Sequence, residues 1–185
     1  MGEPKLAAAE DMPDHIDGER LNGEVYPRAR PSGPHARASS ALGMDLGEPF
    51  QRGRGGPGGW WVLDEPELHQ GGHVLVPDLA GWRLSTLPRL PRDHRFTIRP
   101  DWVCEILSPR SARTDRVVKS PIYASLGIPY LWLIDPLEQT LEVRALHGAH
   151  YTVIQAFGGP ETVHAEPFAA APLELDALWE PLDAP

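Results

Sequence analysis

The spacing of apolar residues along the chain predicts a protein built from both strands and helices. Short apolar runs predict strands at 60–64, 73–82, 101–107, 130–136, 141–146 and 151–157. The run at 101–107 is apolar at nearly every position, which is typical of a buried strand at the centre of a sheet. Residues 65–72 are expected to form the turn between the first two of these strands.

Other segments have apolar residues three or four positions apart, which predicts helices. One helix is expected over about 35–46, where it would cover one face of the sheet, and a short one over 173–179 near the C-terminus. A third is expected to begin near Ser111 or Thr114 and to end at Gly127. Pro121 cannot donate a backbone hydrogen bond, so we expect a kink or a new helix start at Ser120.

Glycine, proline and asparagine predict the turns and loops. Asn22-Gly23 lies between two short apolar flanks, and this dipeptide favours a two-residue hairpin turn in which both positions have positive φ. The segment 52–59, R-G-R-G-G-P-G-G, predicts a flexible connection, although an RGG-like segment that binds nucleic acid is the alternative. Residues 83–100 are rich in proline and arginine and predict a long surface loop, a kind of segment that is often functional.

Length and composition limit the class of protein. With 185 residues, the chain is expected to comprise a flexible leader at 1–15 and a single domain at 16–185. No apolar run approaches the roughly 20 residues that span a bilayer, and the N-terminus lacks the pattern of a signal peptide. We therefore expect a cytoplasmic protein with no membrane partner. The single cysteine, Cys104, lies in an apolar run and is expected to pack in the core.

The charge is unevenly distributed. The net charge of −9 argues against a nucleic-acid partner, but the segment 83–119 contains nine basic and four acidic residues, a local balance of +5. From residue 120 onward, Arg144 is the one basic residue against nine acidic ones. Positive charge is thus concentrated in one part of the chain, which permits a polyanionic partner there. A mixed, solvated surface is the simpler alternative.

Two carboxylates lie within apolar runs of this part of the chain. Asp78 follows Pro77 at a break in one predicted strand, and Glu105 lies inside another, between Val103 and Leu107 on its own face. Burial of a charge is costly unless an ion or hydrogen bonds compensate it. Two carboxylates on neighbouring strands can bind a hard divalent cation, Mg²⁺ or Mn²⁺, and such an ion can act on a phosphate. A strand end for Asp78, or an arginine ion pair for Glu105, is the structural alternative.

Lys119 is the third candidate. The chain has fifteen arginines and two lysines, Lys5 and Lys119, so the choice of lysine at position 119 suggests a role for a compact cation. A lysine beside a metal-bound phosphate can orient water or neutralise charge in the transition state. The alternative is a solvated lysine that pairs with Asp115 one helical turn earlier.

These residues belong to a set of motifs that resembles the Uma-two family. The motifs are E-R-L-N-G-E-V at 19–25, P-D-L at 77–79, E-I-L-S-P at 105–109, D-R-V-V-K-S-P-I-Y at 115–123 and G-I-P-Y-L-W-L-I-D-P at 127–136. The resemblance extends over about 17–179 and depends on the order and spacing of the motifs. It implies an α/β fold with a restriction-endonuclease-like core, in which helices flank a mixed central sheet behind an N-terminal hairpin. It also implies metal ligands at Asp78 and Glu105 and a catalytic lysine at Lys119.

Proteins of the family it resembles are putative endonucleases of the PD-(D/E)xK, restriction-endonuclease-like superfamily, and the chain departs from that superfamily's pattern in one respect. That pattern would place lysine at position 107, which is Leu107 here, so the lysine function would have to come from Lys119 on the following helix. The superfamily commonly has a third acidic ligand, for which Glu19, Glu65 and Glu67 are candidates and Glu67 is preferred. His69 and His73 are interpreted as loop residues, since no further histidine or cysteine stands at zinc-ligand spacing.

The sequence therefore favours a Mg²⁺- or Mn²⁺-dependent DNA endonuclease in which Asp78, Glu105 and Glu67 hold the ion and Lys119 assists the attacking water. Phosphate contacts are expected from four arginines: Arg83, Arg110, Arg113 and Arg116. By analogy with nucleases that cut both strands, a homodimer is expected. The alternative is a catalytically silent module of the same fold that binds protein or nucleic acid.

Overall fold

A six-stranded mixed sheet forms the centre of the protein. The computed structural model describes residues 18–28 and 30–179. The strands of this sheet follow the order β11-β10-β9-β8-β6-β3. They are β3 (Trp60–Asp64), β6 (Leu79–Arg83), β8 (Trp102–Ile106), β9 (Tyr130–Asp135), β10 (Thr140–His147) and β11 (His150–Gly158). Strands β8 and β9 are parallel, whereas the other pairs are antiparallel, so the buried β8 lies at the change of direction.

A second sheet of five short strands carries the N-terminal hairpin. Its strand order is β2-β1-β5-β4-β7. The strands are β1 (Gly18–Leu21), β2 (Glu24–Pro27), β4 (Glu67–Gln70), β5 (His73–Leu75) and β7 (Arg95–Phe96). Asn22 and Gly23 have φ of 53° and 82°, which confirms the predicted two-residue turn.

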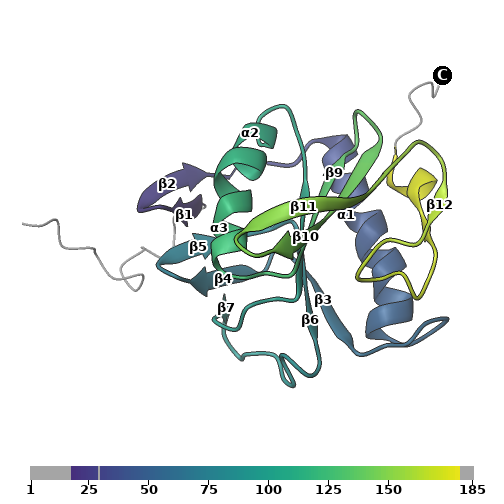
Figure 1. Ribbon diagram of the computed structural model, residues 1–185, viewed down its shortest axis with the longest axis horizontal. Helices are drawn as coiled ribbons and strands as arrows, with labels where there is room; N and C mark the ends of the chain where they lie inside the picture. The colour runs from purple at the N-terminus through teal and green to yellow at the C-terminus, as the bar shows by residue number, and fades with distance from the viewer. Residues whose placement is uncertain (1–17, 29, 180–185) are drawn as a thin grey trace, which may run out of the picture.

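The helices cover both faces of the six-stranded sheet (Figure 1). On one face lies α1 (Gly33–Leu46), which continues into the π-helical turn η2 (Gly47–Gln51). On the other lie α2 (Ala112–Thr114), the π-helical turn η3 (Asp115–Lys119) and α3 (Ser120–Ser125). The C-terminal part adds the two-stranded sheet of β12 (Thr162–Val163) and β13 (Leu173–Glu174), and the 3-10 helix η4 (Leu175–Leu178).

Two apolar clusters hold these layers together. The first joins α1 and the C-terminal segment to the sheet, and Phe168 lies at its centre among Phe50, Trp60, Trp102 and Trp132. The second cluster joins the six-stranded sheet to the five-stranded sheet and to α3. Along β8 the side chains alternate between the clusters, with Trp102, Cys104 and Ile106 on one side and Val103 on the other. Cys104 is fully buried, as its apolar neighbours predict.

The fold class is confirmed as a mixed α/β fold with an N-terminal hairpin, but three details of the prediction are wrong. Residues 65–72 are not simply a turn, because Glu67–Gln70 form strand β4. The run at 73–82 is two strands, β5 and β6, which belong to different sheets because the chain breaks at Pro77. The loop at 83–100 contains the short strand β7, which pairs with β4.

The predicted leader at 1–15 and the ends of the predicted domain, at 16–17 and 180–185, lie outside the described residues. Among the helices of the described part, none combines the length and apolarity needed to cross a membrane.

Truncation of Phe168 tests the first cluster. Phe168 is 2% exposed and contacts four aromatic rings, so Phe168→Ala leaves a cavity and is expected to lower the free energy of unfolding by about 3–5 kcal/mol. Urea unfolding measures this loss. Val153→Ala, at a side chain 49% exposed on β11, is the matched control and should stay within about 0.5 kcal/mol of wild type. Similar values for the two variants would contradict the assignment of Phe168 to the core.

Candidate active site

Strand pairing places Asp78 beside Glu105. Leu79 of β6 is opposite Cys104 of β8, so one step further along the antiparallel ladder Asp78 faces Glu105. Pro77 ends the preceding strand, and the Asp78 side chain turns back so that Oδ2 accepts the Ile106 N–H at 2.6 Å. Both acids are nearly inaccessible, with 9% of Asp78 and 2% of Glu105 exposed.

The π-helical turn η3 brings Lys119 to the same place. Pro121 has no N–H, so the regular helical ladder cannot continue through it, and α3 starts afresh at Ser120 as expected. The Ser120 N–H and hydroxyl both donate to the carbonyl oxygen of Asp115, the hydroxyl at 2.7 Å. This wide turn occurs often at functional sites, and here it leaves Lys119 only 3% exposed.

The Lys119 amine lies among three carboxylates. Its Nζ is 2.7 Å from Glu105 Oε1, 3.0 Å from Glu19 Oε1 and 3.7 Å from Asp115 Oδ1. It also lies 3.5 Å from the carbonyl oxygen of Val76. The three acids come from β1, β8 and η3, so the amine joins both sheets and the helical segment at one point.

Glu19 is held in place by its strand. Residues two apart on a strand share a face, and Leu21 on that face is fully buried, so Glu19 also points inward and is 7% exposed. Its Oε1 accepts the Val76 N–H at 2.7 Å in addition to contacting Lys119. The N-terminal hairpin therefore supplies one wall of the site.

Two further side chains contact the acids. The Tyr123 hydroxyl donates to Glu105 Oε1 at 2.5 Å, and His35 at the start of α1 places Nε2 3.2 Å from Asp78 Oδ1. The other ring nitrogen of His35 is buried without a protein partner. Glu105 and Asp78 are thus each oriented by neighbours from more than one element.

Burial and charge shift the pKa values in this cluster. Burial of the Lys119 amine acts to lower its pKa, but the attraction of Glu105, Glu19 and Asp115 is greater and raises the pKa above its ordinary value. Lys119 is therefore a cation. Burial raises the pKa of Glu105, and Lys119 opposes this rise. Burial acts to lower the pKa of His35, whereas its hydrogen bond to Asp78 raises it, with a net increase.

The cluster borders a cavity of about 560 Å³. The five charged side chains of the cluster, Glu19, Asp78, Glu105, Asp115 and Lys119, all line it. Three arginines also contribute to its lining: Arg28, Arg30 and Arg110. A cavity of this size with acidic groups at its base and arginines in its wall can admit a small anionic group such as a phosphate.

The donor atoms at the base of this cavity fit Mg²⁺ or Mn²⁺. Most are oxygens, supplied by carboxylates and the Val76 carbonyl, which are the ligands these hard cations prefer, and His35 adds one ring nitrogen. The cluster holds four carboxyl groups and one amine, so acidic groups outnumber the cation even with Lys119 protonated. A divalent cation would offset that charge.

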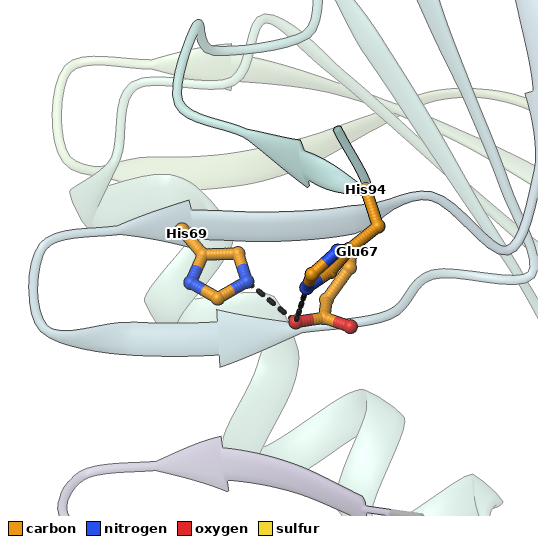
Figure 2. Close-up of side chains that lie close together, drawn as sticks. All are labelled: Glu67, His69 and His94. Atoms are coloured by element: carbon orange, nitrogen blue, oxygen red, sulfur yellow. Dashed lines mark hydrogen bonds and ion pairs between the residues drawn. The ribbon is translucent and has the colours of Figure 1, made fainter. Parts of the chain in front are cut away.

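The structure brings Asp78, Glu105 and Lys119 together but places several other predicted residues elsewhere. Glu67 does not line the cavity, because its carboxylate contacts His69 and His94 on the outer part of the five-stranded sheet (Figure 2). Glu19, another of the three candidates for the third acidic ligand, lies in the cluster in place of Glu67. The third, Glu65, lines the cavity but pairs with Arg28 at 2.6 Å.

Of the four arginines expected to contact phosphate, Arg110 alone lines the cavity. Arg83 lies over the ring of Trp60, with its guanidinium carbon 4.5 Å from the ring centroid. Arg116 pairs with Glu142 at 3.0 Å, and Arg113 is exposed outside the cavity lining. These contacts use the side chains of Arg83 and Arg116 for packing and ion pairing.

Sequence reasoning missed His35 and Tyr123 as members of the cluster, and it named Asp115 only as the partner of a solvated Lys119. Asp115 and Tyr123 each lie four residues from Lys119, so helical spacing could have found them once Lys119 was taken as buried. His35 has no such signal, since it reaches Asp78 through the packing of α1 against the sheet.

The mixed sheet and the buried acid–lysine cluster define the class of protein: a restriction-endonuclease-like fold of the nuclease type. The chain belongs to the Uma2 family, whose description is "Putative restriction endonuclease" and which it matches over residues 6–177. Among solved structures, it is similar to a protein from Anabaena variabilis ATCC 29413 described as a putative nuclease belonging to DUF820. The identity is 25%, the TM-score is 0.76, and the match covers 94% of this chain and 97% of that one. A comparison with curated proteins finds no match.

Removal of the Lys119 cation tests the electrostatics of the cluster. Lys119→Met leaves buried carboxylates without a counter-ion, so we expect the free energy of unfolding to fall by about 3–5 kcal/mol at about pH 8. Without the amine, the folded-state pKa of Glu105 lies further above its unfolded value. A carboxyl group whose pKa is higher in the folded than in the unfolded state stabilises the folded state at pH values below its unfolded-state pKa. This stabilisation is lost as the pH rises through the folded-state pKa. The loss should therefore shrink towards about pH 5.

Urea unfolding of wild type and variant across this pH range, with a chelator present, measures the effect. The double variant Lys119→Met/Glu105→Gln is the control, because it removes one buried charge and should recover part of the loss. A difference from wild type that does not change with pH would show that Lys119 acts through packing alone.

Proposed function

We propose that the protein is a metal-dependent endonuclease that hydrolyses phosphodiester bonds in DNA. The observation that carries the proposal is the convergence of the Lys119 amine with Glu105 and Glu19, at 2.7 and 3.0 Å, beside Asp78 in one cavity. Glu19, Asp78 and Glu105 lie far apart in the sequence, and the burial of such charged groups is costly for stability. Family membership and the structural relative support nuclease activity as the general class.

Asp78 and Glu105 would hold Mg²⁺ or Mn²⁺, with Glu19 as the nearest additional acid. When bound, the ion would polarise a phosphoryl oxygen and lower the pKa of a coordinated water. The chain's own residues have separate tasks. Lys119 orients the attacking water and offsets charge that develops on the phosphate, since it remains protonated. Tyr123 and His35 are positioning residues that hold Glu105 and Asp78.

The basic side chains of the cavity would bind the DNA backbone. Arg110, Arg28 and Arg30 line the wall, and Arg113 is exposed on the adjoining α2. Guanidinium groups suit phosphate oxygens, and such contacts position DNA without selecting its sequence. The acidic remainder of the chain would repel DNA from other surfaces. Homodimerisation for cutting both strands stays a prediction.

Cleavage assays with matched variants test the proposal. With Mg²⁺ or Mn²⁺, wild type is expected to cut plasmid or single-stranded DNA. Asp78→Asn, Glu105→Gln and Lys119→Met should each reduce the rate by at least about 100-fold, because each removes a group that acts on the transition state. Gel analysis of product formation over time measures the rate.

The exposed acids Asp176 and Glu138 provide controls of the same chemistry, and Asp176→Asn and Glu138→Gln should cut at the wild-type rate. Circular dichroism identifies any variant that does not fold. Equal cleavage by wild type and all three site variants would trace the activity to a contaminant and end the proposal.

The second candidate is a silent module of the same fold, and ion binding separates it from a nuclease. If the carboxylates form a metal site, millimolar Mn²⁺ should raise the melting temperature of wild type by a few degrees, but not that of the Asp78→Asn/Glu105→Gln double variant. Differential scanning fluorimetry provides the measurement. An intact fold with no shift in wild type would favour the silent module.

A further inference from the structure

A second group of metal-ligating side chains lies outside the cavity. Glu67 and His69 belong to β4, and His94 directly precedes β7 (Figure 2). Strands β4 and β7 pair in parallel, with Glu67 opposite Arg95, and this pairing carries His94 across 25 residues of sequence to His69. The interpretation of His69 as a plain loop residue is therefore wrong, because it is a strand residue facing two other potential ligands.

The distances suit one small ion. Glu67 Oε1 is 2.5 Å from His69 Nε2 and 3.8 Å from His94 Nε2, and one donor atom from each residue lies within 4.8 Å of the others. Around a tetrahedral Zn²⁺ with bonds of about 2.0–2.1 Å, ligand atoms lie about 3.3 Å apart. The two observed separations bracket that value, and binding of the ion would require side-chain rotations from the present positions.

The backbone anchors the three ligands. Glu67 and His69 lie two apart on a strand and so share one face. His94 is held by the pairing of β7 and by Phe96, whose ring stacks on the buried Trp82 at 4.9 Å. Burial is graded across the site, with side-chain exposures of 14% for His69, 35% for Glu67 and 60% for His94. The exposed histidine gives an ion access and leaves room for water as a fourth ligand.

We propose that Glu67, His69 and His94 form a binding site for Zn²⁺. Two imidazole nitrogens and one carboxylate are a donor set that Zn²⁺ favours, whereas Mg²⁺ favours oxygen. The site is separate from the oxygen-lined cavity, which does not include any of the three residues. Bound Zn²⁺ would fasten the arginine-rich loop at 84–94 to the five-stranded sheet.

Zinc titration of the wild-type chain, the parent of the variants below, tests this site in excess Mg²⁺, which occupies the oxygen site. After removal of metals with a chelator, calorimetry is expected to give one Zn²⁺ per chain, and Co²⁺ should give the visible absorption of a tetrahedral complex. His69→Ala and His94→Ala should each weaken Zn²⁺ binding by at least about 10-fold. His150→Ala, which removes an exposed histidine on β11, is the matched control and should bind as the parent does.

Limited trypsin digestion adds a readout of the loop itself. Mass spectrometry should show slower cleavage after Arg89 and Arg92 when Zn²⁺ is present, in the parent but not in His94→Ala. His94 is 60% exposed, so this variant is expected to fold. Absence of Zn²⁺ binding by the parent, or equal binding by His94→Ala and His150→Ala, would overturn the proposal. Neither result would bear on the nuclease proposal, which concerns other residues.

Discussion

The ion cluster around the Lys119 amine is the interaction on which the arrangement of this protein depends. A buried ammonium requires counter-charges, and here they come from β1, β8 and η3. The cluster therefore has to form for the N-terminal hairpin, the central sheet and the helical segment to pack as they do. Such clusters rarely increase stability over an apolar core of the same shape, so their presence in a small domain is better explained by chemistry than by stability.

The backbone around the cluster departs from regular structure at two prolines, and each departure aims one side chain. Pro77 lies in the break between β5 and β6, where the chain changes sheets, and Asp78 directly precedes β6 and faces Glu105. Pro121 stops the ladder of the preceding turn, and η3 results, with the Asp115 carbonyl satisfied by Ser120. A regular helix through this segment would rotate Lys119 away from its present direction, because a π turn changes the phase of all preceding side chains.

Sequence reasoning could reach the central parts of this fold and site because their signals are local. The apolar run of β8, the Asn22-Gly23 turn and the lone lysine of the domain each identify themselves within a few residues. What it could not reach depends on pairing between distant segments. β4 has few apolar residues and becomes a strand through pairing with its neighbours β5 and β7. The residues adjacent to Glu67 in the sequence therefore do not show that Glu67 lies outside the cavity. The position of Arg83 outside the cavity, over the ring of Trp60, was likewise not visible in the local sequence.

The two candidate metal sites differ in the hardness of their donors, and this difference determines how they can coexist. The cavity offers oxygens to an ion that must stay exchangeable and accept a phosphate, whereas Glu67, His69 and His94 offer nitrogen to an ion that binds more tightly. They are also connected, because β4 carries Glu67 and His69 while β5, the other strand of its hairpin, leads through Pro77 to Asp78. An ion that rigidifies this hairpin restricts the backbone from which Asp78 extends. If both sites bind the proposed ions, selection by donor type would let one hairpin support both without competition for the same ion.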